Sequence, residues 1–305
     1  NIFGLRIYSI GGPCIPRGAE RPMLLCSLME RMSGWIKRLL YPSWGLSTSL
    51  LQRRFAQRIV VVTGASRGIG AALVRLQSYQ VHFVLVARTE PELLQLAQEV
   101  EALGTSAECY AVDLREREAL RDLCRILAER YPRVDYFFAN AGKSICRSLE
   151  DSQERLHDFD RTIDLNYRAM VYLAQTLYPA LAATRGVLVY TSSVSLLYPP
   201  APHWAAYHAS KGAADIWLRT AREEWALRGV RVRIAYMPLV HTSMADVNPR
   251  YVHLLGYTAE EAATRLIRLA VGRRSSYAPW WARLSSPLSS LFRGIVTYAY
   301  RRVSH

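Results

Sequence analysis

The fold is decided by residues 59–70, Ile-Val-Val-Val-Thr-Gly-Ala-Ser-Arg-Gly-Ile-Gly. The β-branched run 59–63 is typical of a buried strand, and a helical stretch follows the glycines. Glycines at such a junction permit a tight turn and let the backbone approach a pyrophosphate at the positive end of the helix. Because the loop stands between a strand and a helix, it predicts a dinucleotide site rather than a structural turn. The predicted contacts are Gly64, Ser66, Arg67, Gly68, Ile69 and Gly70.

Downstream of this loop, short β-branched runs alternate with helical stretches. The runs typical of strands are 59–63, 82–87, 109–112, 134–139, 187–191 and 230–236. Between them, apolar residues recur three and four apart, as in 91–103 and 259–270. Both of these helices begin with capping-box spacing, at Thr89/Glu92 and Thr258/Glu261, and Gly104 stands where a helix C-cap belongs. The alternation predicts an α/β fold with a doubly wound, Rossmann-like parallel sheet in one domain, residues 58–270.

The end of the second strand bears on the choice of cofactor. A dinucleotide fold that selects NAD usually has an acidic residue there to bind the ribose hydroxyls. Here Ala87 occupies that place and Arg88 follows it, while Arg67 adds a second cation in the glycine loop. Two guanidinium groups and no carboxylate suit a 2′-phosphate, so the sequence predicts NADP rather than NAD.

A second group of polar residues indicates proton chemistry. Tyr207 and Lys211 are four residues apart and so lie on one face of a helix. A free phenol has a pKa of about 10, and a nearby ammonium group lowers that value toward neutrality. The strand 187–191 ends in Ser192-Ser193, which brings a hydroxyl to the carboxyl edge of the sheet, where open α/β sheets bind ligands.

Five motifs in register carry a family resemblance: Thr63–Gly70 with its glycine spacing, Asn140-Ala-Gly142, Asn166, Ser193 and Tyr207-x3-Lys211. Over about residues 58–245 the chain resembles the short-chain dehydrogenase/reductase family. The resemblance implies that Tyr207 is the general acid/base and that Lys211 lowers its pKa and binds the nicotinamide ribose. It also implies that Ser193 holds the substrate carbonyl and Asn166 supports a water relay. It implies further that Asn140 supports the cofactor pocket, that Asp113 contacts the adenine and that Thr242 contacts the nicotinamide amide. Finally, it implies a homodimer or homotetramer that forms through the helices containing Asn166 and Tyr207.

The chain departs from the family pattern in three places. The interval from Ser193 to Tyr207 is one residue longer than is commonest, which leaves Ser192 and Ser195 as alternatives to the preferred Ser193. The segment from Gly70 to Arg88 is about one residue short and lacks the usual glycine before the second strand. The family's Pro-Gly after the sixth strand is Pro238-Leu239 here.

The last departure concerns the substrate. Residues 237–244 and 257–263 resemble the branch containing bacterial long-chain acyl-CoA and fatty-aldehyde reductases. The loop 241–258 carries Met244, Val247, Tyr251, Val252, Leu254, Leu255 and Tyr257, which suits a lipid-like substrate, although core or subunit packing explains these residues equally well. We therefore expect an NADPH-dependent reductase of a carbonyl in a hydrophobic, lipid-derived molecule of fatty aldehyde or acyl-CoA type. The alternatives are a 3-ketosphinganine-, 3-oxoacyl- or steroid-type keto reductase and a non-catalytic NADP-binding scaffold, which usually lacks the tyrosine or the lysine.

The formal net charge of +14 is concentrated in the two flanks. Residues 1–57 and 271–305 each carry +6, which leaves +2 for 58–270. No nucleic-acid reading motif accompanies this charge. In the N-terminal extension, Met32, Trp35, Ile36, Leu39 and Leu40 recur beside basic residues, and Trp280, Trp281, Leu284, Leu288, Leu291, Phe292 and Ile295 do so in the C-terminal extension. Basic amphipathic helices predict peripheral contact with an anionic membrane, and packing on the fold or on a partner subunit is the alternative.

The remaining expectations concern compartment and chain start. The five cysteines form no CxxC pair or Cys/His cluster, which predicts no metal site and a reduced, cytoplasmic compartment, at the inner face of the membrane if the flanks bind it. No apolar run reaches the ~20 residues of a membrane-spanning helix. Since the sequence begins with Asn1, we interpret it either as a fragment or as an over-extended reading; in the second case residues 1–22 are not native and Met23, Met29 and Met32 are the candidate starts.

Overall fold

The computed structural model describes residues 34–42, 45–77, 80–243 and 254–303. Its contacts divide the chain into two units, Asn1–Leu39 and Leu40–His305. In the first unit the described residues, 34–39, are helical, with Trp35 and Leu39 exposed. The expectations for residues 1–22 and for Met32, and those for Met244, Val247, Tyr251 and Val252, lie outside the described residues.

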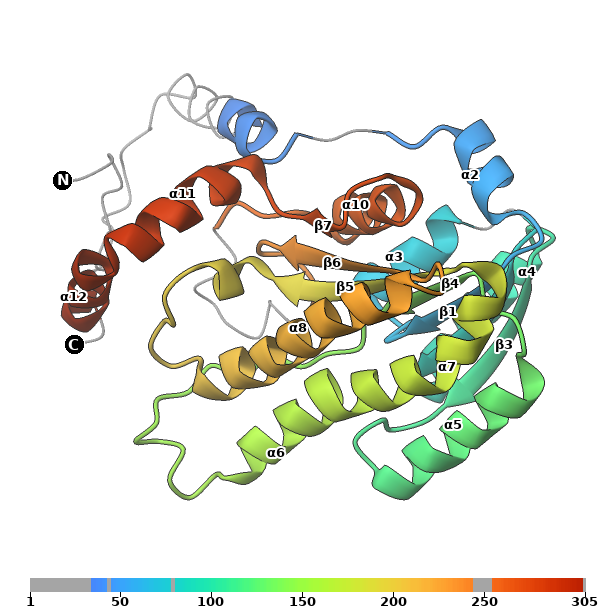
Figure 1. Ribbon diagram of the computed structural model, residues 1–305, viewed down its shortest axis with the longest axis horizontal. Helices are drawn as coiled ribbons and strands as arrows, with labels where there is room; N and C mark the ends of the chain where they lie inside the picture. Colours follow the sequence, from blue (N-terminus) through green and yellow to red (C-terminus); the bar gives the residue numbers. More distant parts are fainter. Residues whose placement is uncertain (1–33, 43–44, 78–79, 244–253, 304–305) are drawn as a thin grey trace, which may run out of the picture. The chain divides into compact units, whose positions relative to one another are not determined.

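The second unit is built on one parallel sheet of seven strands in the order β3-β2-β1-β4-β5-β6-β7 (Figure 1). Its strands are β1 Ile59–Thr63, β2 His82–Ala87, β3 Ser106–Ala111, β4 Tyr136–Ala139, β5 Val187–Ser193, β6 Arg231–Met237 and β7 Ser276–Tyr277. This confirms the predicted doubly wound, Rossmann-like α/β fold. The third strand begins and ends earlier than the sequence predicted, the fourth begins later, and β7 was not predicted, because two residues carry no periodicity.

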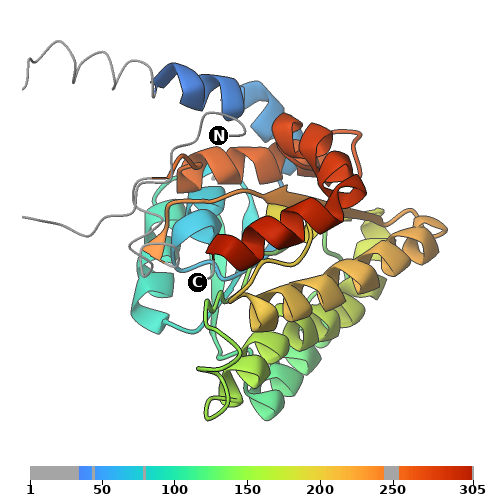
Figure 2. The same ribbon diagram turned by 90° about the vertical axis from the view of Figure 1, so that its left-hand side faces the viewer.

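Helices cover both faces of the sheet, and Figures 1 and 2 show α10 and α8 on opposite sides of it. The side chains of β1 alternate accordingly: Val60 and Val62 belong to one core cluster and Val61 to the other. The first cluster is closed by α2 Thr48–Phe55, α3 Gly68–Leu76, α4 Glu90–Glu101 and α10 Ala259–Val271. The second is closed by α5 Arg117–Arg130, α7 Met170–Thr184 and α8 Ala205–Ala226. Short elements η1 Asp164–Ala169, α6 His157–Ile163 and η2 Val194–Leu197, and the terminal helices α11 Trp280–Leu291 and α12 Arg293–Val303, complete the unit.

The two expected helix caps have different outcomes. Thr258 and Glu261 form the predicted capping box at α10, each side chain accepting from the other residue's backbone N–H. Thr89 makes no such bond at α4, so that prediction was wrong. Its Oγ1 instead accepts from Arg67 Nη2 at 3.1 Å, because a cation from another loop reaches the hydroxyl. Gly104 follows α4 with φ +80°, as expected for a C-terminal glycine.

The core of the second unit extends beyond residues 58–270 on both sides. Tyr41, Leu51 and Phe55 are buried in the cluster beneath α10, and Ala282 of α11 is fully buried. These side chains pack here because α3 and α10 leave apolar surface that the sheet alone does not cover. None of the helices within the described ranges is long and apolar enough to cross a membrane.

Candidate active site

The order of the strands reverses between β1 and β4, and the predicted site residues gather at that point. Thr63, the last residue of β1, has a hydroxyl that accepts from the backbone N–H groups of Asn140 and Ala141, both at 3.2 Å. The Asn140 side chain donates to the carbonyl of Gly64 at 3.3 Å and accepts from Thr191 Oγ1 at 3.2 Å. The ends of β1, β4 and β5 are thereby tied together at the edge where such sheets bind ligands.

The glycine loop has the form that a pyrophosphate requires. Gly64 and Gly68 have φ values of +66° and +56°, which side chains rarely adopt. At Gly70, a Cβ would lie 2.1 Å from the carbonyl oxygen of Gly64. The first turn of α3 holds no acidic residue, and its N-cap, Arg67, makes no side-chain cap bond, so neither the cap nor the turn itself supplies an acceptor side chain to the first N–H groups. The loop therefore fits a dinucleotide phosphate.

The residues predicted to recognise the rest of the dinucleotide lie around this loop. Arg67 is about half exposed and bonds to Thr89, with Glu92 Oε2 at 3.2 Å from its Nη2. Arg88 is exposed at the end of β2. Thr242 lies against the loop, since its Cγ2 is 3.2 Å from the position of a Cβ on Gly68.

Asp113 follows β3 and is paired within its own turn. Arg115 Nε donates to Asp113 Oδ1 at 2.9 Å, and the Arg115 backbone N–H donates to the same atom at 3.1 Å. The side-chain bond from Arg115 is the largest influence that holds the pKa of the Asp113 carboxyl below its ordinary value, and Arg88 adds to it. Its predicted contact with adenine stays a prediction.

Lys211 is buried beneath the sheet edge. Its Nζ donates to the carbonyl oxygen of Thr191 at 2.8 Å and lies 4.6 Å from the centroid of the Tyr190 ring. Burial lowers the pKa of the ammonium group to about 7. The only charge-stabilising groups among these contacts are a carbonyl dipole and an aromatic face, which offset part of the desolvation.

Tyr207 stands on the same face of α8, one turn before Lys211. Burial raises the pKa of its phenol, and the Ser193 hydroxyl beside it opposes that rise. The net direction is opposite to the lowering expected from Lys211, because desolvation outweighs the favourable groups around the phenol. Trp204 flanks the ring edge-on, with centroids 5.8 Å apart.

The three candidate serines occupy different positions. Ser193 is the last residue of β5; its hydroxyl neighbours Tyr207 and lies 2.8 Å from Ser195 Oγ. Ser192 points to the opposite face of the strand and is buried. Ser195 reaches the site through Ser193, to whose Oγ its backbone N–H donates. The geometry favours Ser193 over the two alternatives.

Asn166 is fully buried in the π-helical turn η1, a local widening that is frequent at functional sites. Its Oδ1 accepts from the Lys143 N–H at 2.8 Å, and its Nδ2 donates to the Lys143 carbonyl and to Ser210 Oγ, both at 2.9 Å. A Cβ on Gly142 would lie 3.2 Å from Asn166 Oδ1 and 3.3 Å from Lys211 Nζ, so both groups border Gly142. The structure thus brings Asn166, Ser193, Tyr207 and Lys211 together.

Sequence reasoning missed three residues that hold this arrangement: Thr63, Thr191 and Ser210. Thr63 and Ser210 each act through a hydroxyl, and Thr191 acts through both its hydroxyl and its carbonyl group, on residues remote in the chain. Ser210 could have been found, because it lies three residues after Tyr207 and immediately before Lys211 on one helix.

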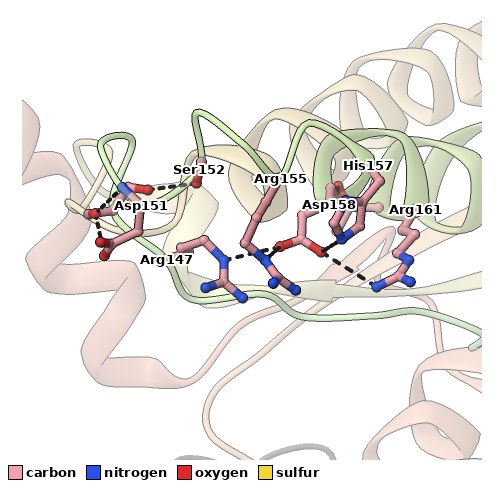
Figure 3. A network of polar contacts seen from close by, with 9 residues as sticks. Arg147, Asp151, Ser152, Arg155, His157, Asp158 and Arg161 are labelled. Atoms are coloured by element: carbon pink, nitrogen blue, oxygen red, sulfur yellow. Dashed lines mark hydrogen bonds and ion pairs between the residues drawn. The ribbon is translucent and has the colours of Figure 1, made fainter.

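A cluster of charged residues secures the loop between Gly142 and α6 (Figure 3). Asp158 is buried, and Arg147 Nε contacts its Oδ2 at 3.1 Å, with Arg155, His157 and Arg161 within 3.6 Å. Burial alone would raise the pKa of this carboxyl, but Arg147 and the neighbouring cations hold it below its ordinary value. The backbone N–H of Arg147 donates to His203 at 2.7 Å, so the loop is anchored to the start of α8.

Fold and site together define a nicotinamide-dependent oxidoreductase. A family model described as short chain dehydrogenase matches residues 58–250, and the chain belongs to this family. It is 32% identical to a fatty acyl-CoA reductase of Acinetobacter baylyi over 78% of this chain and 81% of the relative. It is 34% identical to a fatty acyl-CoA reductase of Mycobacterium tuberculosis over 76% and 80%. A crystal structure of a metagenomic short-chain oxidoreductase in complex with NADP is similar, with 27% identity, a TM-score of 0.63 and coverage of 74% of this chain and 97% of that one. No group of side chains in the described part of the chain has the composition of a metal site.

Proposed function

We propose that this oxidoreductase uses NADPH to reduce a carbonyl group in a hydrophobic, lipid-derived molecule of fatty aldehyde or acyl-CoA type. One observation carries the proposal: Ser193, Tyr207, Lys211 and Asn166 converge beside a phosphate-binding loop at the strand switch point. A hydroxyl, a phenol and an ammonium group at this edge suit hydride reduction, in which a proton must reach the carbonyl oxygen.

The cofactor would be held by residues from several loops. Gly64, Ser66, Gly68, Ile69 and Gly70 would hold its pyrophosphate, and Arg67 and Arg88 would bind the 2′-phosphate. Asn140, Tyr207, Lys211 and Thr242 would bind the nicotinamide half, and Asp113 would contact the adenine. When bound, NADPH supplies the hydride.

The chain itself orients the carbonyl and delivers the proton. Ser193 Oγ donates a hydrogen bond to the carbonyl oxygen, which directs it toward the Tyr207 hydroxyl. Tyr207 gives its proton to that oxygen; its raised pKa keeps the phenol protonated and ready to donate at neutral pH. Lys211 stabilises the phenolate left behind. The hydrogen bond from Asn166 Nδ2 to the Lys143 carbonyl supports a water molecule that returns a proton to Tyr207.

The substrate class has separate support. Two relatives above 30% identity carry the name fatty acyl-CoA reductase. In this chain, the aromatic Trp204 stands beside Tyr207, with ring centroids 5.8 Å apart. In the loop 241–258, Tyr257 is buried in the core cluster beneath α10 and Leu255 packs against it, as the packing alternative for these two residues predicted. Apolar and aromatic groups around a few polar ones are typical of sites for hydrophobic ligands.

The test is an assay of NADPH oxidation with long-chain acyl-CoA, fatty aldehyde, 3-ketosphinganine and a steroid ketone. We expect turnover with the aldehyde or the acyl-CoA, and a loss of about 10²–10⁴-fold in Tyr207→Phe, which keeps the ring but not the hydroxyl. Turnover only with the keto substrates would replace the proposed substrate class. Undiminished turnover in Tyr207→Phe would overturn the mechanism.

The cofactor preference has its own test. Substituting Arg67→Ala together with Arg88→Ala should raise the KM for NADPH about tenfold or more and leave the KM for NADH unchanged, because only the 2′-phosphate is contacted. Arg121→Ala, at an exposed position on α5, is the matched control. An equal effect on both cofactors would contradict the assignment.

Assembly and location are proposals as well. We expect a homodimer or homotetramer through the helices that contain Asn166 and Tyr207, in a cytoplasmic enzyme that rests at the inner face of the membrane. Tyr172 of α7 and Ile216 of α8 are exposed apolar side chains on this helix layer, which supports the assembly. Light scattering on the purified chain tests it, and a monomer would contradict it.

A further inference from the structure

The terminal helix α11 turns its leucine side chains to solvent, whereas Trp281, Ala282 and serine side chains make its contact with the fold. Leu284, Leu288 and Leu291 are 65%, 56% and 75% exposed. The side toward the fold carries Ala282, which is fully buried, and the partly buried Ser285 and Ser289. A helix that only covers the core would have the reverse arrangement, because burying leucine side chains is what stabilises such a helix.

The exposed apolar surface continues from α11 into α12. Phe292, Ile295 and Tyr298 are exposed there as large apolar side chains, and Trp280 begins the same surface. We call this set the C-terminal platform: Trp280, Leu284, Leu288, Leu291, Phe292, Ile295 and Tyr298. Contiguous apolar surface of this kind marks an interaction site.

The charge around the platform has one sign. Arg283, Arg293, Arg301 and Arg302 lie among its residues, and residues 262–305 contain no Asp or Glu. The Arg302 guanidinium packs on the Tyr298 ring, with its carbon 5.2 Å from the centroid. A partner of the platform must therefore have an apolar region that these side chains can enter, together with negatively charged groups.

The helix that carries most of the platform contacts the segment that follows the candidate catalytic residue Ser193. Ser285 Oγ donates to the Trp281 carbonyl at 2.8 Å, so in its 2.6 Å contact with Tyr198 the phenol is the donor. Tyr198 directly follows η2, the turn that begins after Ser193. Figure 1 shows α11 and α12 beyond the ends toward which β5 and β6 point, the edge that carries the active site.

We propose that the C-terminal platform docks on an anionic lipid bilayer and holds the catalytic edge of the sheet against it, so that a membrane-dissolved carbonyl chain reaches Tyr207 directly. The second half of this statement rests on the proposed lipid substrate. Leucine, phenylalanine and tryptophan enter the interface, and the arginines meet the phosphate groups, which is how basic amphipathic helices bind membranes.

The charge favours a bilayer over a second copy of the chain. A two-fold dimer through this surface would place the same patch on both sides, with arginine facing arginine and no carboxylate of the patch between them. An anionic bilayer instead supplies the missing negative charge over the whole platform.

The test is co-sedimentation of the full chain with vesicles of phosphatidylcholine, with or without phosphatidylglycerol. We expect pelleting with the anionic vesicles that weakens at high salt. Combined Leu284→Ser, Leu288→Ser and Leu291→Ser should lower the partition coefficient about a hundredfold, because three side chains lose their transfer into the interface. The matched control is Leu94→Ser, Leu103→Ser and Leu227→Ser, three exposed leucines on other elements, which should pellet like the parent.

A second variant tests the proposal independently, in case the leucine variant fails to bind because it does not fold. Arg283→Gln with Arg293→Gln keeps the leucines and should weaken pelleting with the anionic vesicles alone; circular dichroism checks the fold of both variants. Failure of the parent to pellet, or equal pelleting of the leucine variant, would overturn the proposal. A leucine variant that pellets normally but changes from dimer to monomer in light scattering would show an interface between copies instead, which also overturns it.

A kinetic readout separates this proposal from the proposed function. Reduction of a long-chain aldehyde embedded in anionic vesicles should fall in the leucine variant, whereas reduction of a short, water-soluble aldehyde should be unchanged. If no aldehyde or thioester is reduced by the parent, the proposed function fails while the pelleting result still decides the docking surface. If the leucine substitutions change the reduction rates of the two aldehydes equally, the delivery of substrate from the bilayer is refuted.

Discussion

Replacing Lys211 by methionine tests whether the active site stores an unfavourable charge. The Lys211 ammonium is buried, and among the described residues one carbonyl oxygen and one aromatic ring stabilise its charge. Methionine fills a similar volume without a charge. We expect Lys211→Met to be more stable than the parent at neutral pH and, because the phenolate of Tyr207 loses its cation, to lose about 10²–10⁴-fold in turnover.

The magnitude follows from the pKa of the ammonium group, which burial lowers from 10.5 to about 7. A lysine with a lowered pKa binds fewer protons in the folded than in the unfolded state, so folding stability rises with pH between about 7 and 10.5. At about 1.4 kcal/mol per pKa unit, the charge destabilises the folded state by roughly 4 kcal/mol at pH 7. Methionine also loses the bond to Thr191, worth about 1 kcal/mol, which leaves a net gain of about 3 kcal/mol.

The assay is urea unfolding of parent and variant from pH 6 to pH 10, with NADPH oxidation measured in parallel. The stability advantage of the variant should be nearly constant below pH 7 and shrink by about 3 kcal/mol toward pH 10, because over this range the lysine is protonated only in the unfolded state and that proton becomes less favourable as the pH rises. A variant less stable than the parent at pH 7, or an advantage that does not change with pH, would refute the reasoning.

Two further predictions concern glycines. Gly70→Ala should destabilise the fold by at least about 3 kcal/mol in urea unfolding, since its Cβ would meet the Gly64 carbonyl at 2.1 Å; Gly212→Ala on α8, with open space, should instead stabilise by about 0.5–1 kcal/mol. Equal effects of the two would contradict the close approach. Gly142→Ala should lower kcat about 10–100-fold with little change in melting temperature, because its Cβ crowds Asn166 Oδ1 at 3.2 Å; unchanged kcat would show that this contact does not position the site.

Much of the fold followed from local pattern. The strands at 59–63 and 82–87 have the predicted bounds, because β-branched runs between glycine-rich turns have few other stable conformations. The capping box at Thr258 formed as predicted, but Thr89 did not form one. The two sequences share the capping spacing, but at the first of them the Arg67 guanidinium contacts both Thr89 and Glu92.

The candidate site shows the same division. The i, i+4 spacing correctly places Tyr207 and Lys211 on one helix face. The bond from the ammonium group to Thr191 could not be predicted in this way, because its acceptor lies on a strand twenty residues earlier. A buried cation bonds to the acceptors that the surrounding chain supplies. Ser193 was separated from Ser192 only once the strand direction fixed which side chain faces α8.

The sequence by itself determined the alternation of strands and helices, the phosphate loop and the chemical types of the site residues, because these depend on neighbours within a turn or a strand. Tertiary structure decided how groups remote in the chain face one another. It set the lowered pKa of Lys211, the exchange of partners at Thr89 and the outward leucines of α11. The physical reason is that burial and hydrogen-bond partners are properties of the assembled sheet, and the same helix periodicity is compatible with either face turned toward it.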